Sequence, residues 1–307
     1  MPIGRSRRSF STPPAPRGEV VSFAAGSWGQ LAVEVREPSG PAQGTAILLH
    51  STMASRRIFN SPREQGLATL LNDNRLRTLA LDFRGHGDSG PNARQGGVWT
   101  FDDFVREDVP ALCRAARDRW PEDKLTLVGH SLGGQAAIAS VATGLADADA
   151  IVVLSTNVWL PSDESNPVLR AKKAAIVRFC GLTTRARGYF PARALGFGSD
   201  DEAAAYMAAW TRFWTRDRWT NEDLGIDYLE AMSRLRVPLL SISSLGDDCF
   251  CTPPCAARFV LRAPRERTTF ELVRRADDGG PPPPHMELVT TRAAASFWQR
   301  AADFCKA

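Results

Sequence analysis

Short apolar segments alternate with helical segments along most of this chain, and this alternation restricts the fold more than any other feature. Each apolar segment is as short as a buried strand, far below the roughly 18 residues that span a bilayer. The expected strands are 45–50, 77–82, 124–129, 150–155, 238–244 and 268–274. The expected helices are 58–72, 101–120, 132–142, 254–263 and 292–306. This order predicts an α/β fold with a mostly parallel sheet covered by helices on both faces, preceded by a hairpin over 20–37.

The alternation stops between Trp159 and Arg236, where the chain contains helices and loops instead. This segment holds all three tyrosines of the protein and half of its eight tryptophans. An apolar stripe at helical spacing consists of Tyr206, Met207, Trp210, Phe213 and Trp214. Such a stripe packs on the main domain, lines a pocket from the underside of a cap, or does both. We therefore predict one catalytic domain, 19–158 and 237–307, with 159–236 inserted as a helical cap.

The formal charge of +4 has a local origin in Arg5, Arg7, Arg8 and Arg17. The first 18 residues contain no acid and four of the 38 basic residues, which leaves 34 basic against 34 acidic residues in the rest of the chain. We predict a disordered basic tail over 1–18 and no nucleic-acid footprint on the body of the protein. The arginines lack the apolar segment that follows them in an export signal, so we expect a cytoplasmic protein without a membrane span.

Six cysteines are scattered along the chain, and only Cys249, Cys251 and Cys255 lie close together. Their spacing lacks the Cys-x-x-Cys pair or the accompanying histidines that are typical of a zinc site. In a chain without a secretory signal, we therefore expect reduced thiols and no bound metal.

The segment 125–134 joins a strand, a Gly-x-Ser-x-Gly motif and a helix. An apolar run leads directly into Gly129-His130-Ser131-Leu132-Gly133, and the helical pattern starts at once. A serine at such a turn is pushed into the open, while Gly129 and Gly133 let the two backbones approach closely. The helix N-terminus also directs N–H groups toward the hydroxyl. Ser131 is therefore the predicted nucleophile.

These motifs resemble those of the α/β-hydrolase superfamily. The 48–52 segment looks like the family's strand that ends in His-Gly-x, and 81–89 matches its Asp-x-Arg-Gly-x-Gly-x-Ser loop. The 129–134 segment is similar to the Gly-His-Ser-x-Gly-Gly form found in many lipases, esterases and thioesterases. The resemblance is strongest to bacterial α/β hydrolases related to serine aminopeptidases and monoacylglycerol lipases. It implies an eight-stranded, mostly parallel sheet, a helical cap after the sixth strand, and a Ser-His-Asp triad.

Of the four histidines, only His285 has the position of a general base. In a hydrolase of this type the base follows the serine and the acid. His50 ends a strand, His86 lies in a Gly-rich loop, and His130 is next to the serine and points elsewhere. His285 lies between the last strand and the last helix. The prolines 281–284 stand where the family generally has Gly, and they either present the imidazole rigidly or hold it away until substrate binds.

Two neighbouring carboxylates, Asp247 and Asp248, follow the expected strand 238–244. A triad uses one buried acid to orient the imidazole. The family pattern of two acids before a Pro- or Ala-rich stretch aligns with Asp248-Cys249-Phe250, which favours Asp248. Asp247 stays as the alternative, and the carboxylate that is not used could cap the loop.

These residues predict a serine hydrolase that cleaves a carboxylic ester, lactone or thioester through an acyl-enzyme. The expected oxyanion donors are the backbone N–H groups of Leu132 and of Thr52, which matches the x of the family's His-Gly-x. The family has Gly where this chain has Ser51. The residues expected to contact an apolar part of a small-molecule substrate are Trp159, Trp210 and Trp214. The mechanism needs no metal or organic cofactor.

Two other functions stay open at this stage. The same triad performs acyl transfer if the cap excludes water and admits an acceptor alcohol or amine. The fold also serves as a non-catalytic small-molecule-binding module in some relatives, although an intact set of Ser, His and Asp argues against that. The oligomeric state is open as well, and a homodimer is among the options.

Overall fold

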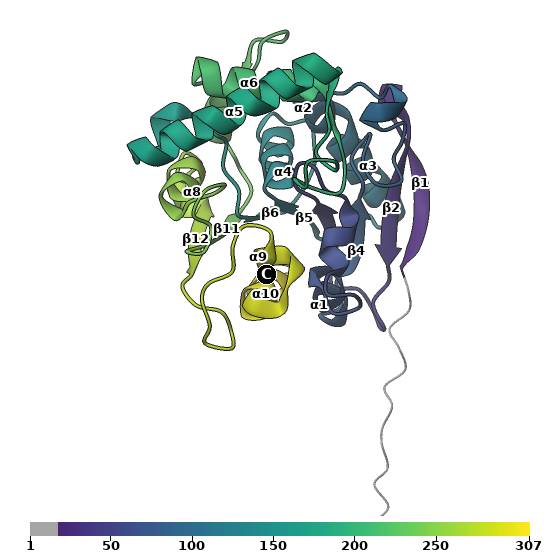
Figure 1. Ribbon diagram of the computed structural model, residues 1–307. Helices are drawn as coiled ribbons and strands as arrows, with labels where there is room; N and C mark the ends of the chain where they lie inside the picture. The colour runs from purple at the N-terminus through teal and green to yellow at the C-terminus, as the bar shows by residue number, and fades with distance from the viewer. Residues whose placement is uncertain (1–17) are drawn as a thin grey trace, which may run out of the picture.

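The computed structural model describes residues 18–307, in which eight strands form one sheet (Figure 1). In spatial order the strands are β1 (Glu19–Ala25), β2 (Gly29–Arg36), β4 (Arg77–Leu81), β3 (Thr45–Leu49), β5 (Leu125–His130), β6 (Ala150–Leu154), β11 (Leu239–Ser244) and β12 (Thr268–Val273). All neighbours from β4 to β12 run parallel, whereas β2 pairs antiparallel with both β1 and β4. The mostly parallel sheet and the opening hairpin are thus confirmed. The basic tail predicted for 1–18 lies, apart from Gly18, outside the described residues.

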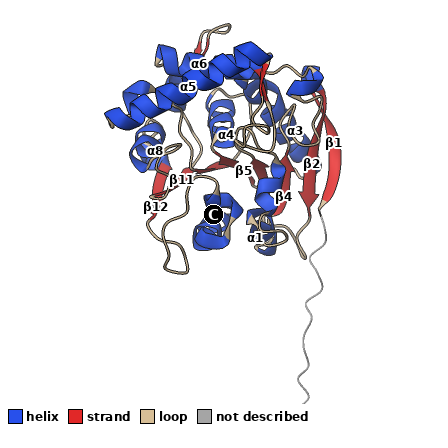
Figure 2. Cartoon of the chain, in the orientation of Figure 1, coloured by secondary structure: helices blue, strands red, loops and turns tan. Residues whose placement is uncertain are grey.

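Helices cover both faces of the sheet, and Figure 2 shows the strands between the two layers. The first layer consists of α1 (Leu67–Asp73), α9 (Glu287–Thr290) and α10 (Ala295–Lys306), and the second of α3 (Val109–Arg119), α4 (Leu132–Ala142) and α8 (Pro253–Val260). Along β3, Ile47 and Leu49 belong to the core under the second layer, while Ala46 and Leu48 belong to the core under the first. All four are fully buried. Because neighbouring side chains of a strand point to opposite faces, a strand that is apolar throughout needs cover on both.

The single helix predicted over 58–72 is wrong, because α1 covers only its last part. A 3₁₀ turn over Arg56–Asn60 comes first, and Pro62 then lacks the N–H that a helix interior requires. Gly66 precedes α1 in an extended conformation, and a Cβ at Gly66 would lie 2.4 Å from the carbonyl oxygen of Phe59. Close packing of the backbone at this glycine therefore divides the segment.

The segment 159–236 is inserted between β6 and β11 and is mainly helical. It contains α5 (Pro167–Arg187), β7 (Tyr189–Phe190), β8 (Glu202–Ala203), α6 (Ala204–Arg216), β9 (Thr220–Asn221), β10 (Ile226–Asp227) and α7 (Tyr228–Met232). Helices α5 and α6 lie side by side across the top of the molecule in Figure 1. Phe213 of α6 packs edge-on against Phe101 of α2 (Phe101–Asp103), with 5.7 Å between the ring centroids. Within residues 18–307, no helix has both the length and the apolarity of a membrane span.

Candidate active site

Ser131 lies at a sharp turn between β5 and α4. Its backbone has φ 51° and ψ −113°, a positive-φ conformation that is rare for a residue with a side chain. A Cβ on Gly129 would lie 2.3 Å from the backbone nitrogen of Gly134, and one on Gly133 would lie 2.0 Å from the carbonyl oxygen of Leu49. The two glycines are therefore required by close approach of strand and helix. The strand–turn–helix arrangement predicted around this serine is present.

His285 lies in the loop before α9 and is hydrogen-bonded to Asp247. The Nδ1 atom of His285 is 2.5 Å from Oδ2 of Asp247, so Nδ1 donates and Nε2 is left as the acceptor. The other carboxylate oxygen, Oδ1, accepts the backbone N–H groups of Phe250 and Cys251 at 3.0 and 2.9 Å. Burial raises the pKa of Asp247, but the hydrogen bond and charge of His285 outweigh it and hold the pKa below its usual value. Asp247 is thus a charged carboxylate that is hydrogen-bonded to the His285 imidazole.

The carboxylate beside His285 belongs to Asp247, whereas the sequence favoured Asp248. The backbone N–H of Asp247 donates to the carbonyl of Ser244 at 3.1 Å and closes a turn after β11. The N–H groups of Phe250 and Cys251 hold the Asp247 side chain in the interior, where it is 2% exposed. The neighbouring Asp248 is exposed. The direction of this turn, which no local pattern specifies, decides between the two acids.

The prolines before His285 lie against the end of β11. The hydroxyl of Ser244 donates to the carbonyl of Pro283 at 2.6 Å. Gly246 is so close to this run that a Cβ on it would lie 2.1 Å from the carbonyl oxygen of Pro282. The prolines thus run against the end of β11 and lead into His285, whose Nδ1 is hydrogen-bonded to Asp247.

The histidines His50 and His130 are buried and use their rings for structural contacts. In His50, Nδ1 donates to the carbonyl of Ser51 at 2.8 Å, and Nε2 accepts the N–H of Phe83 at 3.1 Å. In His130, Nε2 donates to the carbonyl of His285 at 3.1 Å, and the two rings lie 4.9 Å apart. Burial and then the charge of His285 lower the pKa of His130 to about 3. His130 thus holds the backbone of His285 through its ring.

The loop after β3 carries Thr52, and Leu132 begins α4. Neither backbone N–H donates a hydrogen bond to another residue within 18–307, and both residues line a pocket together with Ser131. The Thr52 hydroxyl and the backbone N–H of Met53 instead donate to Oε1 of Glu202, at 2.9 and 2.7 Å. The inserted segment therefore fixes the loop that carries the expected oxyanion donor.

Glu202 is a site residue that sequence reasoning missed. It is fully buried in β8, and besides the Thr52 loop it contacts Nε2 of His86 at 3.1 Å and Nε1 of Trp99 at 3.3 Å. Burial lowers the pKa of His86, but the charge and hydrogen bond of Glu202, aided by Asp200, outweigh it and raise the pKa to about 9. His86 is therefore protonated at neutral pH. The two partners are 116 positions apart in the chain, so no local motif links them.

The His86–Glu202 pair predicts a stability change at alkaline pH. Because the folded-state pKa of His86 is about 9 against 6.5 unperturbed, its stabilising contribution is complete below pH 6.5 and is lost as pH rises through 9. The contribution is on the order of 3 kcal/mol. In urea unfolding, the difference in free energy of unfolding between wild type and Glu202→Gln should shrink by that amount over this range. A difference that stays constant with pH would contradict a charged pair.

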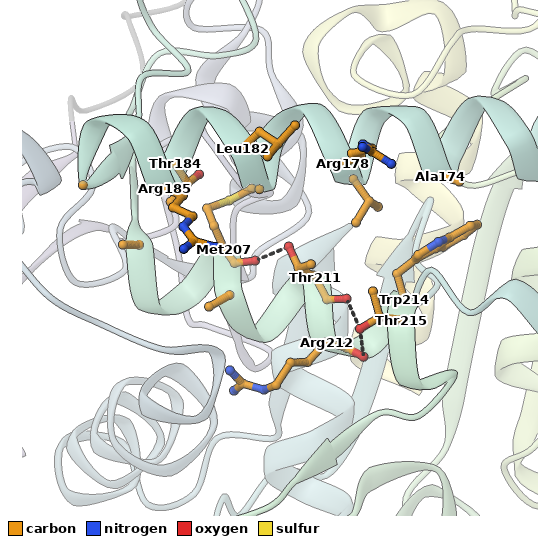
Figure 3. Close-up of a pocket in the computed structure, with 15 residues that line it drawn as sticks. Ala174, Arg178, Leu182, Thr184, Arg185, Met207, Thr211, Arg212, Trp214 and Thr215 are labelled. Carbon is orange, nitrogen blue, oxygen red and sulfur yellow. Dashed lines mark hydrogen bonds between the residues drawn. The ribbon is translucent and has the colours of Figure 1, made fainter.

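A pocket of about 330 Å³ lies over Ser131 and His285. Trp159 and Trp210 line it as expected, with their ring centroids 5.2 Å apart. Trp214 does not line it and instead lies in a second cavity between α5 and α6 (Figure 3). Within the described chain, no hydrogen bond joins the Ser131 hydroxyl to His285, although both side chains face this pocket. Such bonds often tighten only when substrate is bound.

The sequence matches the hydrolase family described as "Serine aminopeptidase, S33" over residues 52–276. A serine hydrolase-like protein of Danio rerio is 29% identical over 174 residues, which cover 56% of this chain and 49% of that protein. The chain thus spans about half the length of this curated relative.

Several solved structures share the fold at low sequence identity. An esterase of Pyrococcus furiosus is 16% identical with a TM-score of 0.62, and the match covers 98% of this chain and 96% of that one. The esterase domain of a Rhodothermus marinus protein is 17% identical, with a TM-score of 0.59 and coverage of 94% and 97%. A monoacylglycerol lipase of Paleococcus ferrophilus is 16% identical, with a TM-score of 0.58 and coverage of 90% and 98%. These similarities establish the α/β-hydrolase fold.

Proposed function

The chain belongs to the hydrolase family described as serine aminopeptidase, S33, and on this premise we propose that it hydrolyses a small carboxylic ester. The observation that carries the proposal is the hydrogen bond of His285 to buried Asp247, behind a pocket that Ser131 also lines. A nucleophile, a base and an orienting acid are the groups that acyl transfer to water requires.

In the proposed mechanism, His285 Nε2 removes the proton of the Ser131 hydroxyl as its oxygen attacks the acyl carbon. Asp247 stabilises the imidazolium that forms. The tetrahedral intermediate collapses when His285 gives the proton to the leaving alkoxide, which departs as an alcohol and leaves an acyl-serine. Water then loses a proton to His285 and attacks the acyl carbon. As the second tetrahedral intermediate collapses, His285 returns that proton to the Ser131 oxygen, which releases the carboxylic acid and restores the hydroxyl.

The backbone N–H groups of Thr52 and Leu132 are the proposed donors to the oxyanion. Glu202 is a positioning residue in this scheme, because its bonds to the Thr52 hydroxyl and to the Met53 N–H leave the Thr52 N–H free. A carboxylate near a developing negative charge is unfavourable by itself. The adjacent His86 imidazolium offsets that charge, so the loop is held without repelling the transition state.

The lining of the pocket favours an ester over an amino-terminal peptide. None of the described residues that line it is Asp or Glu, so a substrate ammonium group has no counter-ion there. Its walls include Trp159, Trp210, Phe250 and Met286, which suit an apolar acyl or alcohol group. A volume of about 330 Å³ is near the lower end of the about 300–1,000 Å³ of small-molecule sites, which favours short chains. We further propose that the 159–236 segment acts as the cap of this pocket.

Fluorophosphonate labelling tests the proposal directly. We expect one covalent adduct, located on Ser131 by mass spectrometry, because only an activated serine reacts with this probe. The p-nitrophenyl esters of acetate and butyrate should be hydrolysed with a higher kcat/KM than the decanoate, and alanine p-nitroanilide should not be cleaved. Absence of an adduct, or an adduct on another residue, would falsify the proposed chemistry. Faster cleavage of the anilide would identify a peptidase instead.

A further inference from the structure

A second cavity lies between α5 and α6, and Figure 3 shows the side chains that line it from both helices. Its volume is about 750 Å³, within the about 300–1,000 Å³ of small-molecule sites. The floor and sides are apolar, with Val177 and Leu182 from α5 and Met207 and Trp214 from α6. Among residues 18–307, Met207 is the only one that this cavity shares with the pocket over Ser131. The cavity is therefore a separate groove on the outer side of the inserted segment.

Among the residues that the structure describes, the charged ones that line this groove are all arginines: Arg178, Arg185 and Arg212. All three are exposed, and none of their guanidinium groups forms an ion pair or a hydrogen bond with another residue in the 18–307 range. Neither α5 nor α6 contains a single Asp or Glu. The groove thus combines an apolar interior with an uncompensated positive rim.

A second copy of this chain is a poor occupant for such a groove. A symmetric contact through this face would bring the three arginines of one copy against those of the other, and like charges at an interface repel. Leu182, on the side of the groove, is 59% exposed, so covering it with an apolar group is favourable. The complementary occupant carries a negative charge at one end and an alkyl chain at the other.

We propose that the α5–α6 groove binds a single molecule of a long-chain carboxylate in its monomeric, non-micellar form. Its alkyl chain lies along Leu182, Ala208 and Trp214, and its carboxylate accepts hydrogen bonds from the guanidinium groups of the rim. Guanidinium forks match a carboxylate better than an ammonium does. This site is distinct from the proposed catalytic pocket and does not depend on Ser131 being a nucleophile.

Isothermal titration calorimetry with dodecanoate, below its micelle concentration, tests the proposal. The full chain with Ser131→Ala is used, so that binding is measured without turnover. We expect saturable binding to one site that weakens as salt is raised, because an exposed charge pair is screened. Acetate, which has the charge without the chain, and dodecyl maltoside, which has the chain without the charge, should not bind in the same range.

Two further variants separate the rim from the interior of the groove. Replacing Arg178, Arg185 and Arg212 by Gln should raise the dissociation constant about tenfold or more. The matched control replaces Arg63, Arg94 and Arg114, which are also exposed and unpaired within the described chain, and should leave the constant within about twofold. Ala208→Phe fills the groove from an exposed position of α6 and should abolish binding without affecting the fold.

Several results would overturn the proposal. Equal binding by the rim variant and its control would remove the role of the arginines, and unchanged binding by Ala208→Phe would place the ligand elsewhere. Binding to vesicles of anionic lipid without binding of monomeric dodecanoate would identify a membrane surface as the occupant. A dimer in sedimentation experiments that Ala208→Phe dissociates would identify a second copy. None of these outcomes bears on fluorophosphonate labelling, so this proposal and the proposed hydrolysis fail independently.

Discussion

Replacing Ser131 by alanine should lower kcat for p-nitrophenyl butyrate by about 10⁵-fold or more, with little change in KM. The proposed nucleophile is removed, whereas the apolar walls that bind the ester are untouched. The Ser131 hydroxyl has no hydrogen-bond partner in residues 18–307, so the free energy of unfolding should change by less than about 1 kcal/mol. Steady-state kinetics together with urea unfolding measure both quantities.

Ser155 provides a matched control for this substitution. It also follows a parallel strand and has a positive φ of 43°, and its buried hydroxyl has no hydrogen-bond partner among the described residues. Ser155→Ala should therefore leave kcat within about threefold of wild type. If both variants lost activity equally, the effect would arise from the strained strand ends and not from a nucleophile.

The two neighbouring acids should differ strongly in their effect on catalysis. Asp247→Asn should lower kcat/KM by about 10⁴-fold, because an amide oriented toward Nδ1 no longer fixes the required tautomer or stabilises the imidazolium. Asp248→Asn should change kcat/KM by less than about threefold, since Asp248 is exposed while Asp247 is hydrogen-bonded to His285. Both substitutions remove one negative charge, and they do so at adjacent positions of the chain. The change in net charge therefore cannot explain a difference in kcat/KM between the two variants.

The opposite kinetic result would contradict the role proposed for Asp247. Loss of activity in Asp248→Asn with full activity in Asp247→Asn would return the acid to the residue that the family pattern favours. Such a result would also require the turn after β11 to rearrange in solution, because the Asp247 carboxylate now accepts the N–H groups of Phe250 and Cys251.

The sequence predicts those parts of the fold that depend on local chemistry. A strand that is covered on both faces must be apolar at every position, and the turn at Ser131 must be flanked by glycines. Both features can therefore be predicted from the residues alone. His285 could be found by elimination because the chain has only four histidines. The division of the 58–72 segment can be predicted from Pro62, which lacks the N–H that a helix interior requires.

The remaining features depend on contacts between distant parts of the chain. The choice of Asp247 over Asp248 is made by a turn whose direction is fixed by backbone N–H groups farther along. Trp214 shares an apolar stripe with Trp210, yet about one helical turn is enough to move it from the pocket over Ser131 into the α5–α6 groove. No sequence pattern identifies Glu202, because the role of a buried carboxylate depends on the residues that it contacts. Its partner His86 is 116 positions away in the chain.

The contact between Glu202 and His86 has a consequence for how this protein can diverge or be re-engineered. An inserted segment taken from another hydrolase, without an acid at the position of Glu202, would leave a buried imidazolium alone at a cost of about 3–5 kcal/mol. New substrate ranges obtained by exchanging that segment therefore require a second change in the host domain, at His86. In natural homologues we expect the two positions to be inherited as a unit, so that substitutions at one are accompanied by substitutions at the other.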